Sequence, residues 1–193
     1  MKKLSILFVS AMLMATVGCK NEKKDVEKEV ETVIKEVKVE ETGFIKVLLT
    51  LESKSESTAT GTVKFSQKNG VVTMNAALSG LTLGTHAIHI HEKADCSSPD
   101  AKSSGGHWNP SAKNHGKWGD AAGYHKGDIG NFEADAKGNG YISMNTDEWC
   151  LGCDDPSKNI MGKAIVVHQG VDDFTSQPSG AAGARVSCGG IIE

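Results

Sequence analysis

From residue 43 onward, apolar side chains recur at every second position, and this pattern restricts the possible folds more than any other feature. It is clearest in the run Ile45, Val47, Leu49 and Leu51, and residues 63–65 and 72–78 continue it. Successive side chains of a strand point to opposite faces, so a period of two predicts half-buried β-strands. A turn containing Asn69 and Gly70 separates two of these runs, as is typical of a hairpin.

Further strands are expected over residues 86–91, 130–136, 140–146, 160–168 and 184–192. No helical pattern alternates with them, so a parallel sheet is not expected, and eight antiparallel strands fit a sandwich or a barrel. The 22 glycines suit short strands and tight turns, and 193 residues suit one domain with additional segments. A net charge of −3 gives no sign of nucleic-acid binding, which normally needs a basic patch.

The first 18 residues have the features of a signal peptide. Two lysines precede an apolar run over residues 4–17, which is too short to span a membrane comfortably. The run ends in small residues before Cys19 and resembles a bacterial lipoprotein signal, although Thr16 stands where such signals usually carry leucine. The resemblance implies an extracytoplasmic protein that is lipidated on Cys19, anchored to a bacterial membrane and facing the periplasm. An ordinary cleaved signal peptide is the alternative.

Residues 19–42 differ in composition from the rest of the chain. They are dense in charge, and four valines recur at helical spacing, at positions 26, 30, 33 and 37. A short coiled coil is one interpretation. The apolar stripe is thin and valine is a modest helix former, so we favour a solvated spacer between a lipid anchor and a domain of residues 43–193.

Two segments, residues 92–126 and 169–183, show no period, and long stretches of this kind are usually functional or disordered. The first holds three of the seven histidines. In the strand before it, His89 and His91 share one face, whereas His86 has the parity of the core residues Ile88 and Ile90. We therefore expect the first two to bind a metal and His86 to be buried in a structural role.

The remaining histidines complete two sets of metal ligands. Three imidazoles and one carboxylate, those of His107, His115, His125 and Asp128, suit zinc. His89 and His91 with a third imidazole suit copper, which favours nitrogen ligands. His168 ends an apolar run with the parity that points it outward, so it is the candidate for that third position.

Several of these segments resemble the copper–zinc superoxide dismutase family, over about residues 43–193. The motifs that carry the resemblance are residues 84–92 (GTHAIHIHE), 106–110 (GHWNP), 113–116 (KNHG), 125–131 (HKGDIGN), 165–168 (IVVH) and 183–189 (GARVSCG). The resemblance implies an eight-stranded antiparallel Greek-key β-barrel, an immunoglobulin-like sandwich with long metal-binding loops. It also implies the dismutation of superoxide, with copper and zinc as cofactors.

The resemblance further implies a role for each site residue. Copper is bound by His89, His91, His107 and His168, and zinc by His107, His115, His125 and Asp128, so that His107 is shared. Arg185 attracts the anionic substrate, and His107 and Arg185 are the catalytic residues. Asp172 links ligands of the two metals, and Cys96 pairs with Cys188.

The sequence departs from the family in two places. The second aperiodic segment is nearly uncharged, so any wider attraction of the anion must come from elsewhere, with candidates Lys93, Lys102, Lys113, Lys117 and Lys126. Cys150 and Cys153 form a C-x-x-C pair, which is similar to the thioredoxin redox motif but lacks a strand-to-helix context. Once Cys19 is lipidated, four cysteines remain outside the cytoplasm, so we favour a local disulfide.

Three functions follow from these patterns. The first is an extracytoplasmic superoxide dismutase, which the complete ligand set and Arg185 favour. The second is a non-catalytic barrel that stores or delivers copper and zinc. The third is a thiol oxidoreductase centred on Cys150 and Cys153. The sequence leaves open whether the protein is a monomer or a homodimer.

Overall fold

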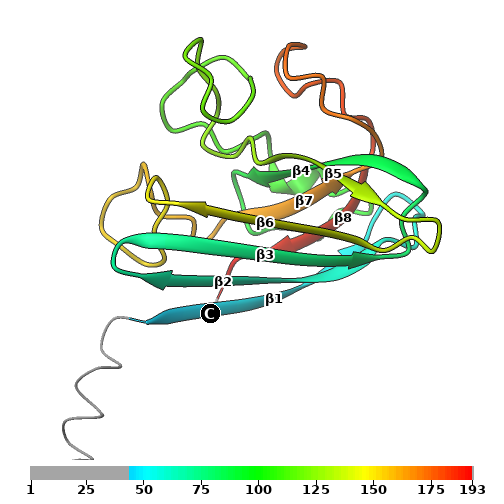
Figure 1. Cartoon of the computed structure of the whole chain (residues 1–193), viewed down its shortest axis with the longest axis horizontal. Coiled ribbons are helices and arrows are strands. Elements are labelled where there is room, and N and C mark those ends of the chain that lie inside the picture. Colours follow the sequence, from blue (N-terminus) through cyan, green and yellow to red (C-terminus); the bar gives the residue numbers. More distant parts are fainter. Residues whose placement is uncertain (1–43, 193) are drawn as a thin grey trace, which may run out of the picture. The chain divides into compact units, whose positions relative to one another are not determined.

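The computed structural model describes residues 44–192, which contain eight strands and one short 3-10 helix (Figure 1). The elements are β1 (Ile45–Ser53), β2 (Thr60–Lys68), β3 (Val71–Ser79), β4 (Gly84–His91), η1 (Lys102–Ser104), β5 (Gly130–Ala134), β6 (Gly140–Thr146), β7 (Ala164–His168) and β8 (Arg185–Gly190). Within these residues, no helix is long and apolar enough to cross a membrane. The expected signal peptide, Cys19 and the charged spacer lie outside the described residues.

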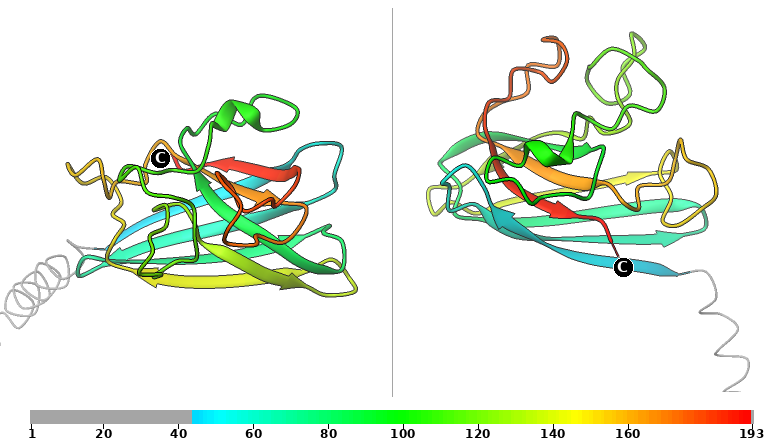
Figure 2. Two further views of the ribbon diagram at one scale, coloured as in Figure 1. Left: turned by 90° about the horizontal axis from the view of Figure 1, so that it is seen from above. Right: turned by 180° about the vertical axis from the view of Figure 1, so that it is seen from behind.

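The strands form a closed antiparallel barrel in the order β1-β2-β3-β6-β5-β4-β7-β8 (Figure 2). The period-two pattern explains its core, because the inward positions of β1, β2 and β3 are buried, as with Val63, Phe65 and Met74 at 0% exposure. The expected all-β barrel is therefore confirmed. The β2–β3 hairpin turns through Asn69 and Gly70, both at positive φ, as the sequence predicted.

Three strands are shorter than expected: β5 ends at Ala134 instead of residue 136, β8 spans Arg185–Gly190 instead of residues 184–192, and β7 differs most. β7 begins at Ala164, whereas the apolar run predicted a strand from residue 160. Gly162 has a φ of 77° and lies in a turn, and its N–H donates to the carbonyl oxygen of Ile191 at 2.8 Å. Ile160 is buried in the core but does not belong to a strand. Its apolar side chain therefore led to a wrong strand prediction at this position.

The two aperiodic segments form long loops that rise from the same side of the barrel (Figures 1 and 2). The β4–β5 loop contains η1, and the Cys96–Cys188 disulfide joins it to β8. Ala101 of this loop forms a small buried cluster with Ala164, Val166 and Cys188, which lie on the outer face of β7 and β8. The loops are thus packed on the barrel and cover its outer face at β4 and β7.

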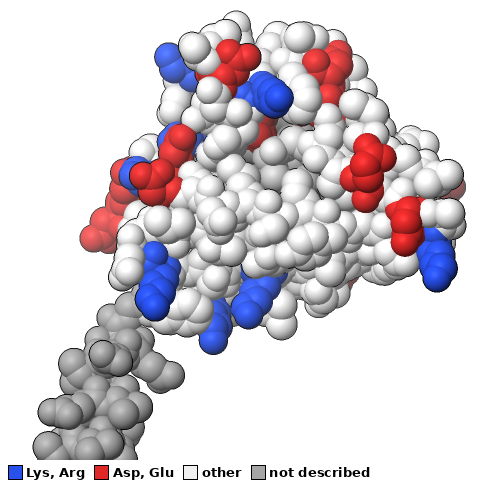
Figure 3. All heavy atoms as spheres, viewed as in Figure 1, with Lys and Arg blue, Asp and Glu red and all other residues white. Residues whose placement is uncertain are grey.

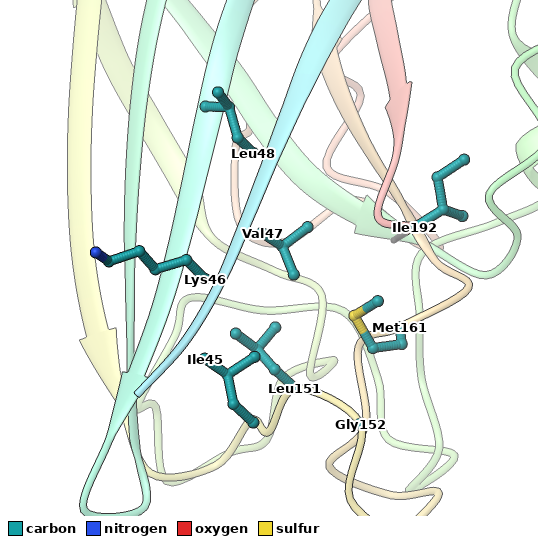
Figure 4. Close-up of a pocket in the computed structure, with 8 residues that line it drawn as sticks. All are labelled: Ile45, Lys46, Val47, Leu48, Leu151, Gly152, Met161 and Ile192. Atoms are coloured by element: carbon teal, nitrogen blue, oxygen red, sulfur yellow. The ribbon is translucent and has the colours of Figure 1, made fainter. Parts of the chain in front are cut away.

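The pairing of β1 with β8 is short and comprises only Glu52–Cys188 and Ser53–Ser187. Toward the start of β1, the strand borders a groove of about 540 Å³ (Figure 4). Its lining residues are Ile45, Lys46, Val47, Leu48, Leu151, Gly152, Met161 and Ile192. This groove holds none of the candidate metal ligands.

Candidate metal centre

The candidate ligands come from two strands and from the loop that covers them. In β4, Ile88 and Ile90 point into the core, so His89 and His91 point outward beneath the β4–β5 loop. They are nevertheless only 0% and 1% exposed. The other ligand candidates, His107, His115, His125, Asp128 and His168, are all buried as well.

These residues form two groups that share one member. In each group, the four candidate ligand atoms lie within 4.8 Å of one another. The groups are His89, His91, His107 and His168, and His107, His115, His125 and Asp128. His86 belongs to neither, and its ring nitrogens bond to the carbonyl oxygens of His168 (2.9 Å) and Thr82 (2.9 Å), as its parity predicted.

In the first group, one nitrogen of each β4 histidine is held by an oxygen acceptor, and the other nitrogen faces the remaining rings of the group. His89 donates from Nε2 to Asp172 Oδ2 at 2.9 Å, and His91 donates from Nδ1 to the carbonyl oxygen of Gly105 at 2.9 Å. The Nε2 atoms of His91 and His168 approach to 3.4 Å. Hydrogen bonds of this kind fix the tautomer and orientation of a ring, so that the free nitrogen can bind a metal.

In the second group, the Asp128 carboxylate lies among three imidazoles. Its oxygens are 2.8, 3.0 and 3.2 Å from the Nδ1 atoms of His107, His115 and His125. Three imidazoles and one carboxylate whose ligand atoms lie this close together are a donor set that suits zinc. The carboxylate is further fixed by the backbone N–H groups of Gly116 and His125, at 3.1 and 2.8 Å.

Four buried nitrogens have no partner in hydrogen-bonding geometry among the described residues, although those of His115 and His125 lie within 3.2 Å of Asp128. They are Nδ1 of His89, Nε2 of His107, Nδ1 of His115 and Nδ1 of His125. An unpaired buried polar atom costs about 1–3 kcal/mol, so each needs an explanation. All four belong to the two groups, and metal ions at the two centres would satisfy all of them.

His107 lies between the groups. Its Nδ1 faces Asp128 in the second group, and its unpaired Nε2 is available to the first. One imidazole therefore offers a nitrogen to each centre.

The Asp172 carboxylate accepts a hydrogen bond from one histidine of each group. Its Oδ2 accepts the hydrogen bond from His89, and its Oδ1 accepts one from His115 Nε2 at 2.8 Å. The backbone N–H of Asp172 donates to Asn131 Oδ1 at 2.9 Å, and Asn131 Nδ2 donates to the carbonyl oxygen of Asp172 at 2.9 Å. At Gly180 a Cβ would lie 1.8 Å from Asp172 Oδ1, so only glycine leaves room for this carboxylate.

Burial controls the protonation of the first group. It lowers the pKa of His89, His91 and His168, and it lowers the pKa of His107 to about 4. These rings are therefore neutral at pH 7, which is the form that binds metals. For His115 burial also lowers the pKa, but the nearby carboxylates of Asp128 and Asp172 outweigh it and raise the value to about 9.

Arg185 lies at the entrance to the first group. It borders a cleft of about 630 Å³ that is also lined by His91, His107 and His168. Its Nη1 donates to the carbonyl oxygen of Ala101 at 2.8 Å and to Ser104 Oγ at 3.2 Å, which fixes the guanidinium. Burial lowers its pKa, but an arginine remains charged at physiological pH.

The five candidate lysines differ in their surroundings. Lys113 lines the cleft, whereas Lys102 pairs with Asp100 at 2.7 Å and Lys126 pairs with Glu148. On the face shown in Figure 3, positive and negative side chains are interspersed and separated by wide uncharged areas. Lys113 is therefore the best placed of the five to attract an anion.

Both expected disulfides are present. Cys96–Cys188 links the β4–β5 loop to β8, and Cys150–Cys153 closes a small loop after β6. No helix follows Cys153 before β7, so the thioredoxin-like context is absent from this part of the structure.

Several supporting groups could not be found by sequence reasoning. The carbonyl oxygens of Gly105, Gly183 and Lys113 accept hydrogen bonds from His91, His168 and His125, but a backbone carbonyl leaves no trace in residue type. Gln177 brackets His115, accepting from its N–H at 2.8 Å and donating to its carbonyl oxygen at 2.9 Å. No spacing pattern pointed to it.

Comparison with known proteins gives consistent matches. The family model described as copper/zinc superoxide dismutase matches residues 59–191. An extracellular Cu-Zn superoxide dismutase of Caenorhabditis elegans is 36% identical over 68% of this chain, and the superoxide dismutase-like protein YojM of Bacillus subtilis is 36% identical over 63%. The matches span only 60% and 61% of those two proteins, but 81% of a Cu-Zn superoxide dismutase of Aquifex aeolicus that is 34% identical over 71% of this chain.

Solved structures agree with these matches. The clock protein EA4 aligns with a TM-score of 0.66 at 33% identity, covering 76% of this chain and 94% of that one. A double mutant of a SOD-like protein from Bacillus subtilis aligns with a TM-score of 0.66 at 31% identity, covering 76% and 97%.

Proposed function

The chain belongs to the copper/zinc superoxide dismutase family, and from this premise we propose that it converts superoxide to oxygen and hydrogen peroxide with copper and zinc as cofactors. The observation that carries the proposal is the pair of ligand groups sharing His107 beside the fixed guanidinium of Arg185. In this proposal, His89, His91, His107 and His168 bind copper, and His107, His115, His125 and Asp128 bind zinc.

Copper, when bound, would supply an electron acceptor for one superoxide and an electron donor for the next, whereas zinc supplies no redox chemistry. The rest of the reaction falls to the protein. Two superoxide anions and two protons give one oxygen and one hydrogen peroxide, so the site must attract anions and deliver protons. Arg185 provides the fixed positive charge at the cleft.

His107 is the group best placed to hold a proton. With Nδ1 bound to zinc beside Asp128, as proposed, the ring could hold a proton only on Nε2, the nitrogen that is available to the first group. Asp128 and Asp172 keep the surrounding rings oriented while that proton is gained and lost.

We further propose that the enzyme acts outside the cytoplasm. Residues 1–18 are a signal peptide, residues 19–42 are a spacer lipidated on Cys19, and residues 43–193 form the enzyme domain that protects this compartment from superoxide. Two disulfides support an oxidising location, and some relatives are named extracellular enzymes.

The test is a dismutation assay on protein loaded with copper and zinc, with metal content measured on the same sample. The parent is expected to be active, and His168→Ala is expected to lose copper and activity while keeping zinc. Full loading without turnover would contradict the proposal and favour a non-catalytic metal-binding role, which the match to a superoxide dismutase-like protein also makes worth testing. Activity that survives Cys150→Ser would exclude the thiol pair as the reactive centre.

A further inference from the structure

The loop after β6 contains a buried tryptophan, a glutamate and a disulfide that the proposed reaction does not use. It comprises residues 147–153, and we refer to it as the tryptophan loop. Trp149 is 1% exposed, and its ring packs edge-to-face against Phe65 of β2, with centroids 6.4 Å apart. The Cys150–Cys153 bond closes the loop, and the N–H of Cys150 donates to the carbonyl oxygen of Lys158 at 2.8 Å. The loop is thereby fixed both to the barrel core and to the turn that follows.

The tryptophan loop contacts the residues on both sides of His125. The indole Nε1 of Trp149 donates to the carbonyl oxygen of Lys126 at 2.8 Å. One oxygen of Glu148 accepts from the Lys126 ammonium, and the other accepts from the Tyr124 hydroxyl at 2.6 Å. Tyr124 and Lys126 are the immediate neighbours of His125, so a candidate zinc ligand lies between two residues held by one loop.

Aromatic packing reinforces these hydrogen bonds. The ring of Trp118 lies between Tyr124 and Trp149, with centroid distances of 5.0 and 5.3 Å. Such pairs stabilise by about 0.5–1.5 kcal/mol beyond the area that they bury. The side chain of Tyr124 is therefore held by its ring as well as by its hydroxyl.

We propose that Glu148 and Trp149 are positioning residues for the zinc ligands. They hold Tyr124 and Lys126 from outside the site, so that the ring of His125 between them stays directed at Asp128, 3.2 Å from its carboxylate. The inference rests on the zinc set of the proposed function. It adds a structural role for the C-x-x-C loop, which the family resemblance left without one.

The contacts of the residue after Lys126 explain why Glu148 and Trp149 are expected to affect His125 in particular. Gly127 is held independently, because its N–H donates to the carbonyl oxygen of Trp108 at 3.0 Å and its own carbonyl oxygen accepts from Ile90 at 2.9 Å. Loss of the contacts at Lys126 therefore loosens the segment on its N-terminal side, which carries His125. The copper-set residues of β4 and β7 lie in strands and do not depend on these contacts.

The experiment measures metal release to a chromogenic chelator from the full-length protein loaded with copper and zinc. Trp149→Phe keeps a ring but removes the N–H, and Glu148→Ala removes both acceptors. Both are expected to release zinc about ten-fold faster than the parent, the size of effect seen when groups that orient metal ligands are removed. Copper release is expected to change much less. Tyr141→Phe is the matched control, because it removes a hydroxyl hydrogen bond to Asn75 on the exposed side of the barrel.

A further variant grades the effect. Glu148→Gln keeps an oxygen that can accept from Tyr124 but loses the charge, so its zinc release is expected to fall between the parent and Glu148→Ala. A general loss of stability would release copper and zinc together, and that result would refute a positioning role. If Trp149→Phe loses its near-ultraviolet circular dichroism, the Glu148 variants decide, because Glu148 is not part of the core.

The outcomes also separate this inference from the proposed function. If the parent retains zinc and the Glu148 and Trp149 variants release it at the rate of Tyr141→Phe, the positioning role alone is overturned. If the parent retains no zinc, the proposed zinc set is wrong and the positioning role falls with it.

Discussion

Asp172→Asn tests whether one carboxylate organises both ligand groups. Asp172 Oδ1 accepts from His115 Nε2 and from the N–H of Phe174, both at 2.8 Å, whereas Oδ2 accepts only from His89 Nε2. An amide has one oxygen, and that oxygen is expected to occupy the position with two donors. Its NH₂ group then faces His89 Nε2.

The His89 ring can accept from this NH₂ group only if its proton moves to Nδ1. That proton would block the lone pair proposed to bind copper. A hydrogen bond to a charged group contributes about 1.5–3 kcal/mol. Removing a group that orients a metal ligand typically costs about 10–100-fold in affinity, equivalent to about 1.4–2.7 kcal/mol. We therefore expect copper affinity to fall about 10–100-fold and zinc affinity to fall less.

The assay is competition with a chelator for each metal, on parent and variant loaded in the same way. Asp173→Asn is the control, since it makes the same chemical change one residue away on an exposed side chain whose partners are Thr175 and Ser176. Unchanged copper affinity in Asp172→Asn, or a greater loss of zinc than of copper, would refute the reasoning.

Three further predictions concern other parts of the molecule. Arg185→Ala is expected to slow dismutation at least about ten-fold and to weaken its dependence on ionic strength, and an unchanged salt profile would show that the guanidinium does not attract the substrate. Gly127→Ala places a Cβ 2.2 Å from the carbonyl oxygen of Ile90 and is expected to lower the free energy of unfolding by about 1–3 kcal/mol, measured by chemical denaturation. Gly106→Ala has open space around the added Cβ and should leave this free energy nearly unchanged, so equal effects of the two substitutions would contradict the packing argument. Burial raises the pKa of Glu148, but hydrogen bonds from Lys126 and Tyr124 outweigh burial and lower the pKa below the ordinary value of 4.5. The ionised Glu148 side chain therefore stabilises the folded protein above pH 4.5, and this stabilisation is lost in acid. The thermal stability of chelator-treated parent should therefore exceed that of Glu148→Gln at pH 7 and converge with it as the pH falls below 4.5; a constant difference would argue against an ionised Glu148.

The barrel was largely predictable, because strand period and turn chemistry are local properties. Alternation in β1 and the Asn69–Gly70 turn both appear in the structure as expected. The start of β7 was predicted wrongly, because Ile160 is buried by tertiary packing and a buried apolar residue looks the same in a strand or a turn. Local patterns report burial more reliably than they report backbone pairing.

The site was predictable to the extent that it depends on side-chain type. The alternation of side chains along the strand predicted that His89 and His91 are candidate metal ligands and that His86 is not. In the structure His86 lies outside both ligand groups and hydrogen-bonds to backbone carbonyl oxygens. The position of His107 between two groups follows only from the fold, since the loop that carries it has no period. The contacts of Trp149 and Glu148 with Lys126 join residues more than 20 positions apart, and nothing in either segment alone indicates them.

The Cys96–Cys188 disulfide has a consequence for when the proposed active site is completed. Arg185 lies three residues before Cys188, and its guanidinium is held by Ala101 and Ser104, in the loop that begins near Cys96. The bond thus closes a ring that contains both the arginine and the groups that fix it. While the cysteines are reduced, this ring is open and Arg185 loses a covalent restraint on its position. If the protein is exported, as proposed, oxidation after export would couple maturation to location, so that a chain retained in a reducing cytoplasm would carry the metal ligands but lack the covalently secured arginine.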